Sequence, residues 1–277
     1  MKSQLSLAVL ICAFACARGE KPSADSATAP AEPAVVTITA RDFAFTMPDT
    51  IQSGLTKLVL VNEGPNIHHA QIVRLEQGKT LADLEAAFKA GGPPPEWAVD
   101  VGGPNAPPIG GSSSTVQQLD PGNYAVICFV DLPDKVPHFA KGMTKAFVVR
   151  PGTSNAVAPT PTVTMTIADY SFNTDTALTA GRQMVKVVNN GPQVHEVTII
   201  KLDSAKTLDD LEKYMQTYKG DLPATTMGGI TAVRPGTTNY FEVDLTPGNY
   251  ILICFVPDSK DGKPHFEHGM LQQLTVN

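Results

Sequence analysis

The chain has 277 residues, a formal net charge of −6 and 42% hydrophobic residues. This length suits two domains of ordinary size, and the hydrophobic content is that of a globular protein. The negative charge argues against nucleic acid as a partner, and no segment after the N-terminus is apolar for long enough to form a transmembrane helix. The 22 glycines and 23 prolines make the chain rich in turns, which favours many short strands.

The first residues have the pattern of an export signal. Lys2 supplies a positive charge, and residues 5–15 are apolar. We therefore expect residues 1–16 to be a signal peptide and the protein to be exported, to the periplasm or the cell surface. Cys16 follows small residues and loosely resembles the lipidated cysteine of a bacterial lipobox, so a lipid anchor is the one membrane contact we leave open. Residues 17–34 are rich in Pro, Ala, Ser and Glu, which predicts a flexible tether.

The rest of the chain repeats one unit. His68 and His195 each follow an Asn-x-Gly-Pro turn and lie 127 positions apart, and other motifs recur at nearly the same offset. A repeat this long indicates a domain duplication and not a solenoid. We expect the domains at residues 35–151 and 162–277, joined by a short Pro- and Thr-rich linker at 152–161.

Each unit is predicted to be mostly β, because its segments alternate apolar and polar residues or form short β-branched runs between turn signals. Strands are predicted, in chain order, at 35–39, 55–62, 67–75 and 124–127 in the first unit and at 163–167, 183–189, 194–202 and 250–253 in the second. One helix interrupts each unit. Thr80 and Thr207 are its predicted N-caps, with Asp83 and Asp210 three residues further on.

A cysteine, a histidine and a methionine recur in that order near the end of each unit, and another histidine lies about sixty positions upstream of each cysteine. Two imidazoles, one thiolate and a weak axial thioether are the ligand types of a blue-copper electron-transfer site. Sulfur suits Cu(I), and imidazole keeps Cu(II) bound. The eight residues are His68, Cys128, His138 and Met143 in the first unit and His195, Cys254, His265 and Met270 in the second.

The loop between cysteine and methionine has features that suit a preorganised site. Pro137 and Pro264 fix φ just before the second histidine, and a glycine before each methionine lets the backbone turn back. A disulfide between Cys128 and Cys254 is the alternative use of the thiols. It is disfavoured because each cysteine follows the equivalent strand of its own unit.

With these motifs, both units resemble the cupredoxin family of type 1 copper proteins, and the Cys…His-x-x-x-Gly-Met loop is similar to the type 1 site of copper nitrite reductases. The resemblance implies an all-β fold of two tandem Greek-key β-sandwich domains, each with one inserted helix. It also implies that each set of four residues binds one copper, which gives two type 1 sites. His69 could compete with His68, but the repeat aligns His68 with His195 and favours His68.

The expected function is electron transfer by copper that cycles between Cu(I) and Cu(II), with redox proteins as partners. An exported copper storage or delivery protein is the alternative, and a metal-free adhesion domain is a third. The resemblance implies that His138 and His265 each present a ring edge at the surface, beside Phe139 and Phe266. Six histidines, four of them assigned, leave too few for a trinuclear cluster, so the sequence predicts a carrier and not an enzyme.

Overall fold

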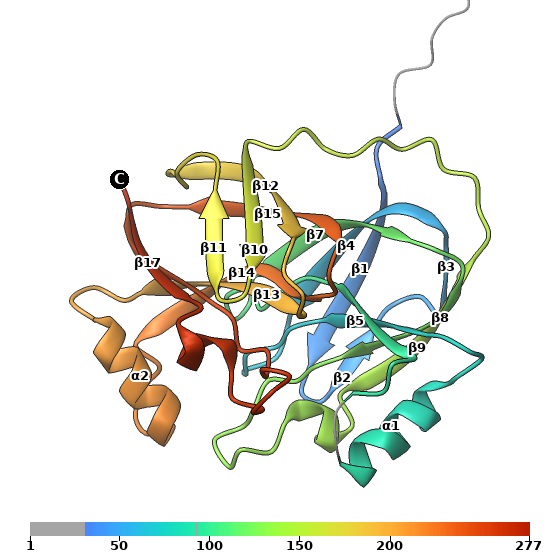
Figure 1. Ribbon diagram of the computed structural model, residues 1–277, viewed down its shortest axis with the longest axis horizontal. Helices are drawn as coiled ribbons and strands as arrows, with labels where there is room; N and C mark the ends of the chain where they lie inside the picture. Colours follow the sequence, from blue (N-terminus) through green and yellow to red (C-terminus); the bar gives the residue numbers. More distant parts are fainter. Residues whose placement is uncertain (1–30, 92–93) are drawn as a thin grey trace, which may run out of the picture. The chain divides into compact units, whose positions relative to one another are not determined.

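Two β-sheets run through residues 31–91 and 94–277, which this computed structural model describes (Figure 1). The predicted signal peptide at 1–16, with Cys16, lies outside the described residues, as do residues 17–30 of the predicted tether. None of the helices in the described ranges is long and apolar enough to cross a bilayer.

The first sheet has eight strands in the order β11, β10, β12, β15, β7, β4, β1 and β2. These strands are β1 (Ala34–Arg41), β2 (Ala44–Thr46), β4 (Gly54–Asn62), β7 (Ser112–Leu119), β10 (Val163–Ala168), β11 (Ser171–Thr174), β12 (Gly181–Asn189) and β15 (Thr238–Leu245). Buried and more exposed residues alternate along β1 and β10, as the sequence pattern predicts for strands with one face on a core.

The second sheet has nine strands in the order β17, β16, β13, β14, β6, β5, β8, β9 and β3. These strands are β3 (Thr50–Gln52), β5 (Gln71–Leu75), β6 (Ala98–Gly102), β8 (Gly122–Ile127), β9 (Thr144–Arg150), β13 (His195–Leu202), β14 (Ala224–Val233), β16 (Gly248–Ile253) and β17 (Leu271–Val276). The all-β fold class is therefore correct.

The main hydrophobic cores are separate although the sheets are continuous. One core draws its residues from positions 36–149 and the other from positions 163–276. Leu58 and Leu60 are fully buried in the first, and burial of each stabilises the fold by about 1.5–3 kcal/mol. Each core includes the cysteine and the methionine of its own half, so these predicted ligands belong to the buried core of that half.

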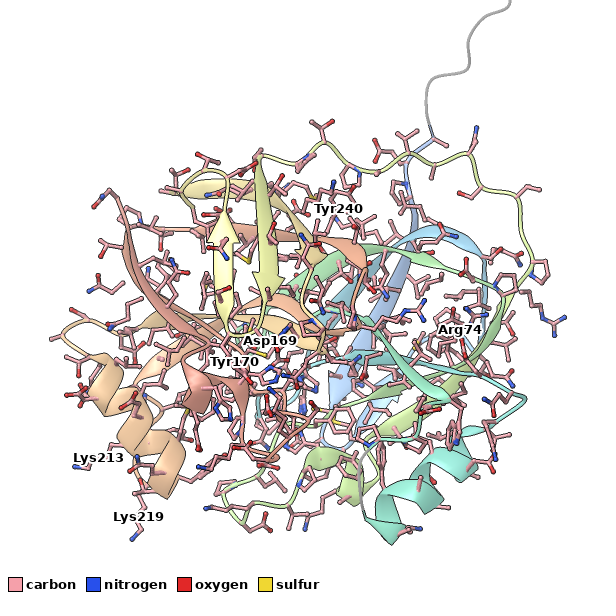
Figure 2. The ribbon with its side chains drawn as sticks, in the orientation of Figure 1. Arg74, Asp169, Tyr170, Lys213, Lys219 and Tyr240 are labelled. Atoms are coloured by element: carbon pink, nitrogen blue, oxygen red, sulfur yellow. The ribbon has the colours of Figure 1, made fainter. Side chains whose placement is uncertain are left out.

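The two halves meet through strand pairing in both sheets. Tyr240 on β15 pairs with Val116 on β7, and Val233 on β14 pairs with Val101 on β6. Tyr240 is labelled in Figure 2. A partly buried ion pair with a Lys57–Glu242 distance of 2.8 Å adds to the first of these contacts. Residues 31–277 form one compact unit for this reason.

One α-helix lies in each half of the described chain, α1 (Leu81–Ala90) and α2 (Leu208–Thr217). Both begin with the predicted capping box, in which Thr80 and Thr207 exchange hydrogen bonds with the residue three positions on. Each cap contributes about 0.5–2 kcal/mol. Each helix also buries a leucine in a small core beside the second sheet, which holds the helix next to the loop with the predicted ligands.

Candidate metal centres

Three predicted ligands of the first half converge in the structure. Cys128 directly follows β8, His68 lies in the segment before β5, and His138 begins the short 3-10 helix η1 (His138–Lys141). The Nδ1 atoms of His68 and His138 are 3.0 Å apart, and Cys128 Sγ is 3.4 Å from His138 Nδ1. All three side chains are buried, so three donor atoms share one dry space that could hold a metal ion.

The second half repeats this geometry. Cys254 follows β16, His195 begins β13, and His265 begins the 3-10 helix η2 (His265–His268). The two Nδ1 atoms are again 3.0 Å apart, and Cys254 Sγ is 3.5 Å from His265 Nδ1. We call the two groups the first centre (His68, Cys128, His138) and the second centre (His195, Cys254, His265).

The predicted methionine ligands lie next to these centres in the fold. Met143 and Met270 are fully buried in the same cores as the cysteines. The backbone N–H of Met143 donates to the carbonyl of His138, and the N–H of Cys128 donates to the carbonyl of Met143. Gly142 makes this return possible with a φ of 97°, which matches the predicted turn before the methionine.

A carboxylate fixes the orientation of the upstream histidine in each centre. Nε2 of His68 lies 2.7 Å from Asp42 Oδ1, and Nε2 of His195 lies 2.7 Å from Asp169 Oδ1. Because each Nε2–H donates to a carboxylate, the Nδ1 lone pair is free and faces the other two donors. Such a carboxylate partner is the usual support of a metal-binding histidine.

These two aspartates were missed by the sequence-based site prediction, although a signal was present. Asp42 and Asp169 recur in register with the repeat, 127 positions apart, as the histidines do. An acidic residue that keeps its place in both copies of a metal-binding unit is a candidate partner of a ligand.

The residue after the upstream histidine joins the two ligand segments in each half. The backbone N–H of Phe129 donates to His69 Nε2 at 2.9 Å, and that of Phe255 donates to Glu196 Oε1 at 2.9 Å. His69 is therefore used to hold the residue beside Cys128, and the structure brings His68, not His69, into the first centre.

Burial sets the protonation of the donors when no metal is bound. It raises the pKa of the Cys128 thiol to about 12 and raises the pKa of the Cys254 thiol as well. It lowers the pKa of His138 and of His265 to about 4, with the neighbouring histidine adding to the shift. The metal-free centres are thus neutral, and a soft cation must displace the thiol proton. One thiolate and two neutral imidazoles fit copper.

The expected exposure of the second histidine is wrong. His138 is 1% exposed and His265 is fully buried. The reason is an aromatic side chain on each: Phe43 packs edge-on against His138 at 5.1 Å and Tyr170 against His265 at 5.3 Å between ring centroids. The exposed aromatic residues near the centres are instead Phe129 and Phe255, each one residue after a cysteine.

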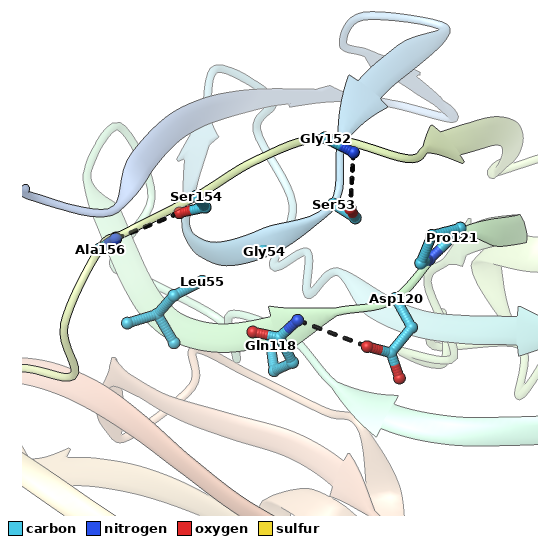
Figure 3. Close-up of a pocket in the computed structure, with 9 residues that line it drawn as sticks. All are labelled: Ser53, Gly54, Leu55, Gln118, Asp120, Pro121, Gly152, Ser154 and Ala156. Atoms are coloured by element: carbon cyan, nitrogen blue, oxygen red, sulfur yellow. Dashed lines mark hydrogen bonds between the residues drawn. The ribbon is translucent and has the colours of Figure 1, made fainter.

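Two other features lie outside these centres. Asp258, Asp261 and His268 form a third group of potential ligands, in which His268 pairs with Asp261 at 3.2 Å. A shallow pocket of about 210 Å³ lies where the turn between β3 and β4 meets residues 152–156 (Figure 3). No predicted ligand lines this pocket.

Comparison with known proteins yields matches in structure alone. No protein-family model and no curated protein sequence matches the chain. Auracyanin from Roseiflexus castenholzii is 19% identical over 44% of this chain and all of that chain, with a TM-score of 0.31. Copper nitrite reductase from Nitrosomonas europaea is 11% identical over 89% of this chain and 94% of that chain, with a TM-score of 0.26. Blue copper oxidase from the same organism is 12% identical over 89% and 86%, with a TM-score of 0.23.

The similar structures include auracyanin and copper nitrite reductase, in line with the resemblance that the sequence motifs indicated. They also contradict the prediction that the chain is not an enzyme, because a nitrite reductase and an oxidase are among the similar structures. That prediction rested on a count of histidines in one chain. The count does not limit the ligands that a second chain can supply to a shared site.

Proposed function

We propose that the chain binds two type 1 coppers, one in each half, and transfers single electrons between redox proteins. The observation that supports this most strongly is the convergence of two Nδ1 atoms and one Sγ in each half, fully buried and with the remaining histidine nitrogen of one ligand held by an aspartate. The proposed ligands are His68, Cys128, His138 and Met143 for one copper and His195, Cys254, His265 and Met270 for the other.

The chain's own residues would hold and shield the metal. When bound, copper supplies a one-electron change between Cu(I) and Cu(II). Asp42 and Asp169 keep a proton on Nε2 of the upstream histidines, so that Nδ1 remains a donor in both oxidation states. The hydrogen-bonded loop from cysteine to methionine fixes the donors before the metal arrives, and little rearrangement is then needed when the charge changes.

Burial of the donors also helps to distinguish electron transfer from copper storage or delivery. The side chains of the four histidines and two cysteines in the two centres are all buried. A delivery protein must surrender its metal to an acceptor, which requires access to the donors, whereas an electron-transfer protein retains the metal through many cycles. The enclosed centres therefore favour electron transfer over storage or delivery.

The finer architecture and the location are part of the same proposal. We propose that each half is a Greek-key β-sandwich domain with one inserted helix, at 35–151 and 162–277, and that 152–161 is the linker. We also propose that residues 1–16 direct export to the periplasm or cell surface, with Cys16 as the residue for a lipid anchor. Labelling with a radioactive fatty acid, in wild type and Cys16→Ser, tests the anchor.

Copper titration of the metal-free protein tests the function. We expect about two coppers per chain, as two ligand sets imply, and an intense visible absorption from thiolate-to-Cu(II) charge transfer. The matched control is the double variant Cys128→Ser, Cys254→Ser. Any copper that this variant binds should lack this absorption. A colourless wild type, or an absorption that the double variant retains, contradicts the proposal. Loss of copper to a chelator within one redox cycle would favour delivery.

A further inference from the structure

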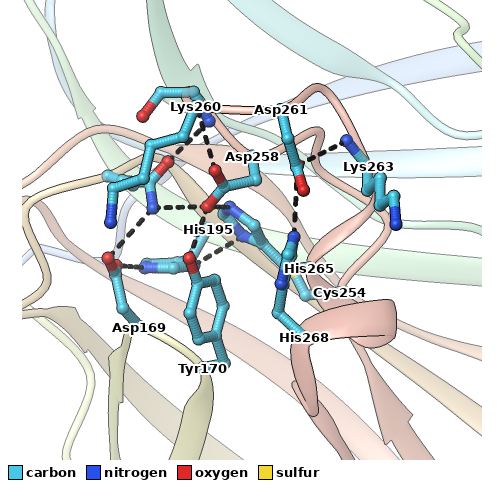
Figure 4. Close-up of polar contacts among 12 residues, drawn as sticks. Asp169, Tyr170, His195, Cys254, Asp258, Lys260, Asp261, Lys263, His265 and His268 are labelled. Carbon is cyan, nitrogen blue, oxygen red and sulfur yellow. Dashed lines mark hydrogen bonds and ion pairs between the residues drawn. The ribbon is translucent and has the colours of Figure 1, made fainter.

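The two centres differ in what faces the second histidine. In the second centre, Nε2 of His265 is buried and has no hydrogen-bond partner among the described residues. The nearest charged group to it is the carboxylate of Asp258, with Oδ2 at 3.7 Å (Figure 4). Asp258 is itself only 3% exposed, so a negative charge lies beside the ring.

Three donors hold the Asp258 side chain in this position. The Tyr170 hydroxyl donates to Oδ2 at 2.5 Å, Gln193 Nε2 donates to the same oxygen at 2.9 Å, and the Lys260 backbone N–H donates to Oδ1 at 2.8 Å. These hydrogen bonds, that of Tyr170 first, hold the pKa of Asp258 well below its usual range. Gln193 also donates to Asp169, so one network joins the carboxylates next to both histidines of the second centre.

Among the described residues, no carboxylate is held beside His138 in this way. The repeat aligns Phe43 with Tyr170, and the Phe43 ring packs on His138 where Tyr170 packs on His265. The bridge between Asp131 and Pro137 corresponds to that between Pro257 and Pro264, which places Leu132 at the position of Asp258.

The other carboxylates near the second histidines match between the halves. His268, which also acts on His265, has Lys141 at its position in the first half. Asp42 acts on His138, and its equivalent Asp169 acts on His265. Because both halves have this aspartate, it does not distinguish the two centres. Asp258 therefore remains as the carboxylate that the second histidine has in one half and lacks in the other.

We infer that Asp258 is a positioning residue that stabilises the oxidised form of the second centre, so that the two centres have unequal reduction potentials. This inference rests on the proposed function. Oxidation of a bound copper makes the ligating imidazole more positive, and a fixed carboxylate in dry surroundings stabilises that charge. One electron given to the fully oxidised protein therefore reduces the first centre, and the second centre is reduced by the next.

Reductive titration of copper-loaded single-centre proteins tests this directly. The Cys128→Ser background isolates the second centre, and in it Asp258→Asn removes the charge while it keeps the shape of the side chain. We expect a positive shift of the reduction potential. Tyr170→Phe keeps the carboxylate charge, so it should shift the potential by less than Asp258→Asn does. The matched control is Asp131→Asn in the Cys254→Ser background, which should leave the potential of the first centre unchanged.

A second readout separates a charge effect from a structural one. If Asp258 acts by its charge, Asp258→Asn weakens binding of Cu(II) more than binding of Cu(I), whereas loss of packing weakens both alike. The reciprocal variant Phe43→Tyr, Leu132→Asp should lower the potential of the first centre. Equal potentials of the two wild-type centres, or an unchanged potential in Asp258→Asn, overturn the inference and leave the proposed function intact. A wild type without thiolate-to-copper absorption overturns both.

Discussion

The first and second centres have nearly the same donors and different surroundings. In each, two Nδ1 atoms lie 3.0 Å apart, and an aspartate lies 2.7 Å from the outer nitrogen of the upstream histidine. Around the second histidine, one half has Phe43 and Leu132 where the other has Tyr170 and Asp258. The duplicated chain has thus kept the atoms that hold a metal and changed those that set its charge environment.

The residue after the upstream histidine shows the same difference. His69 and Glu196 accept the same backbone hydrogen bond, yet one is a neutral imidazole and the other a carboxyl group. Burial, with the neighbouring histidines, lowers the pKa of His69 to about 3, and burial raises that of Glu196 to about 7. A shared structural role therefore tolerates a change of chemical type, provided that a hydrogen-bond acceptor remains.

Removal of one cysteine should produce the largest difference between the two centres. Cys128→Ser is expected to abolish the copper-thiolate absorption of the first centre and leave that of the second, and Cys254→Ser should do the reverse, because each centre draws its donors from one half. Copper content and visible spectra measure this. Loss of both absorptions in either variant would show that the centres depend on each other.

Substitution of Asn105 tests how much contacts from the first half stabilise the second half. Its side-chain amide is buried and donates to Thr198 Oγ1 at 2.8 Å, with Val197 and Glu196 also in reach. Asn105→Ala leaves these groups without their partner, so we expect a loss of about 1–3 kcal/mol in the free energy of unfolding.

Urea unfolding of the metal-free protein measures this loss. The matched control is Asn123→Ala, because Asn123 is exposed and makes one long hydrogen bond within the first half. Equal stability of the two variants would mean that the Asn105 contacts add nothing to the joining of the halves.

The exposed aromatic residues provide the next comparison. Phe129 and Phe255 are 36% and 38% exposed and each is bonded to the cysteine of its centre. We expect Phe129→Ser to slow electron exchange with a redox partner, because an apolar contact next to the ligand is lost, and to leave the visible spectrum unchanged. Val148→Ser is the control, since Val148 is equally exposed but pairs with Asn123 at the far end of β8. Equal exchange rates in both variants would place the docking surface elsewhere.

The smallest expected effect concerns Asp100 on β6, whose repeat counterpart is the uncharged Thr226. Burial, with Glu196 nearby, raises the pKa of Asp100 to about 7. The folded protein thus binds this proton more tightly than the unfolded chain. The resulting stability is present below about pH 4, the ordinary range of an aspartate, and is lost as the pH rises through about 7.

Asp100→Asn should therefore gain stability over wild type as the pH rises from 5 to 8. Urea unfolding at the two pH values measures the difference. A difference in stability that does not change with pH would contradict the assignment of this effect to the carboxyl group.

The repeat made the inner donors predictable, because copper restricts the residue types that can bind it and both copies keep them in register. His68 could be chosen over His69 for the same reason. The surroundings were not predictable, since Asp258 and Tyr170 have no counterpart of their own kind in the first half. Exposure of His138 and His265 was predicted wrongly because the aromatic residues that cover them lie about a hundred positions away in the sequence.

The shared sheets were also beyond the sequence patterns. Alternation identified β1 and β10 as half-buried strands, but it does not specify which strand pairs with an open edge. The pairing of β7 with β15 depends on contacts between the halves, such as that of Lys57 with Glu242. The pattern within each unit carries no information about that contact.

A crystal structure of the copper-loaded protein, with anomalous scattering recorded at the copper absorption edge, tests the central claim most directly. Two peaks are predicted, one among His68 Nδ1, His138 Nδ1 and Cys128 Sγ and the other among His195 Nδ1, His265 Nδ1 and Cys254 Sγ. A single peak, or copper bound at His69 or at the group of Asp258, Asp261 and His268, would contradict the proposal of one copper centre in each half.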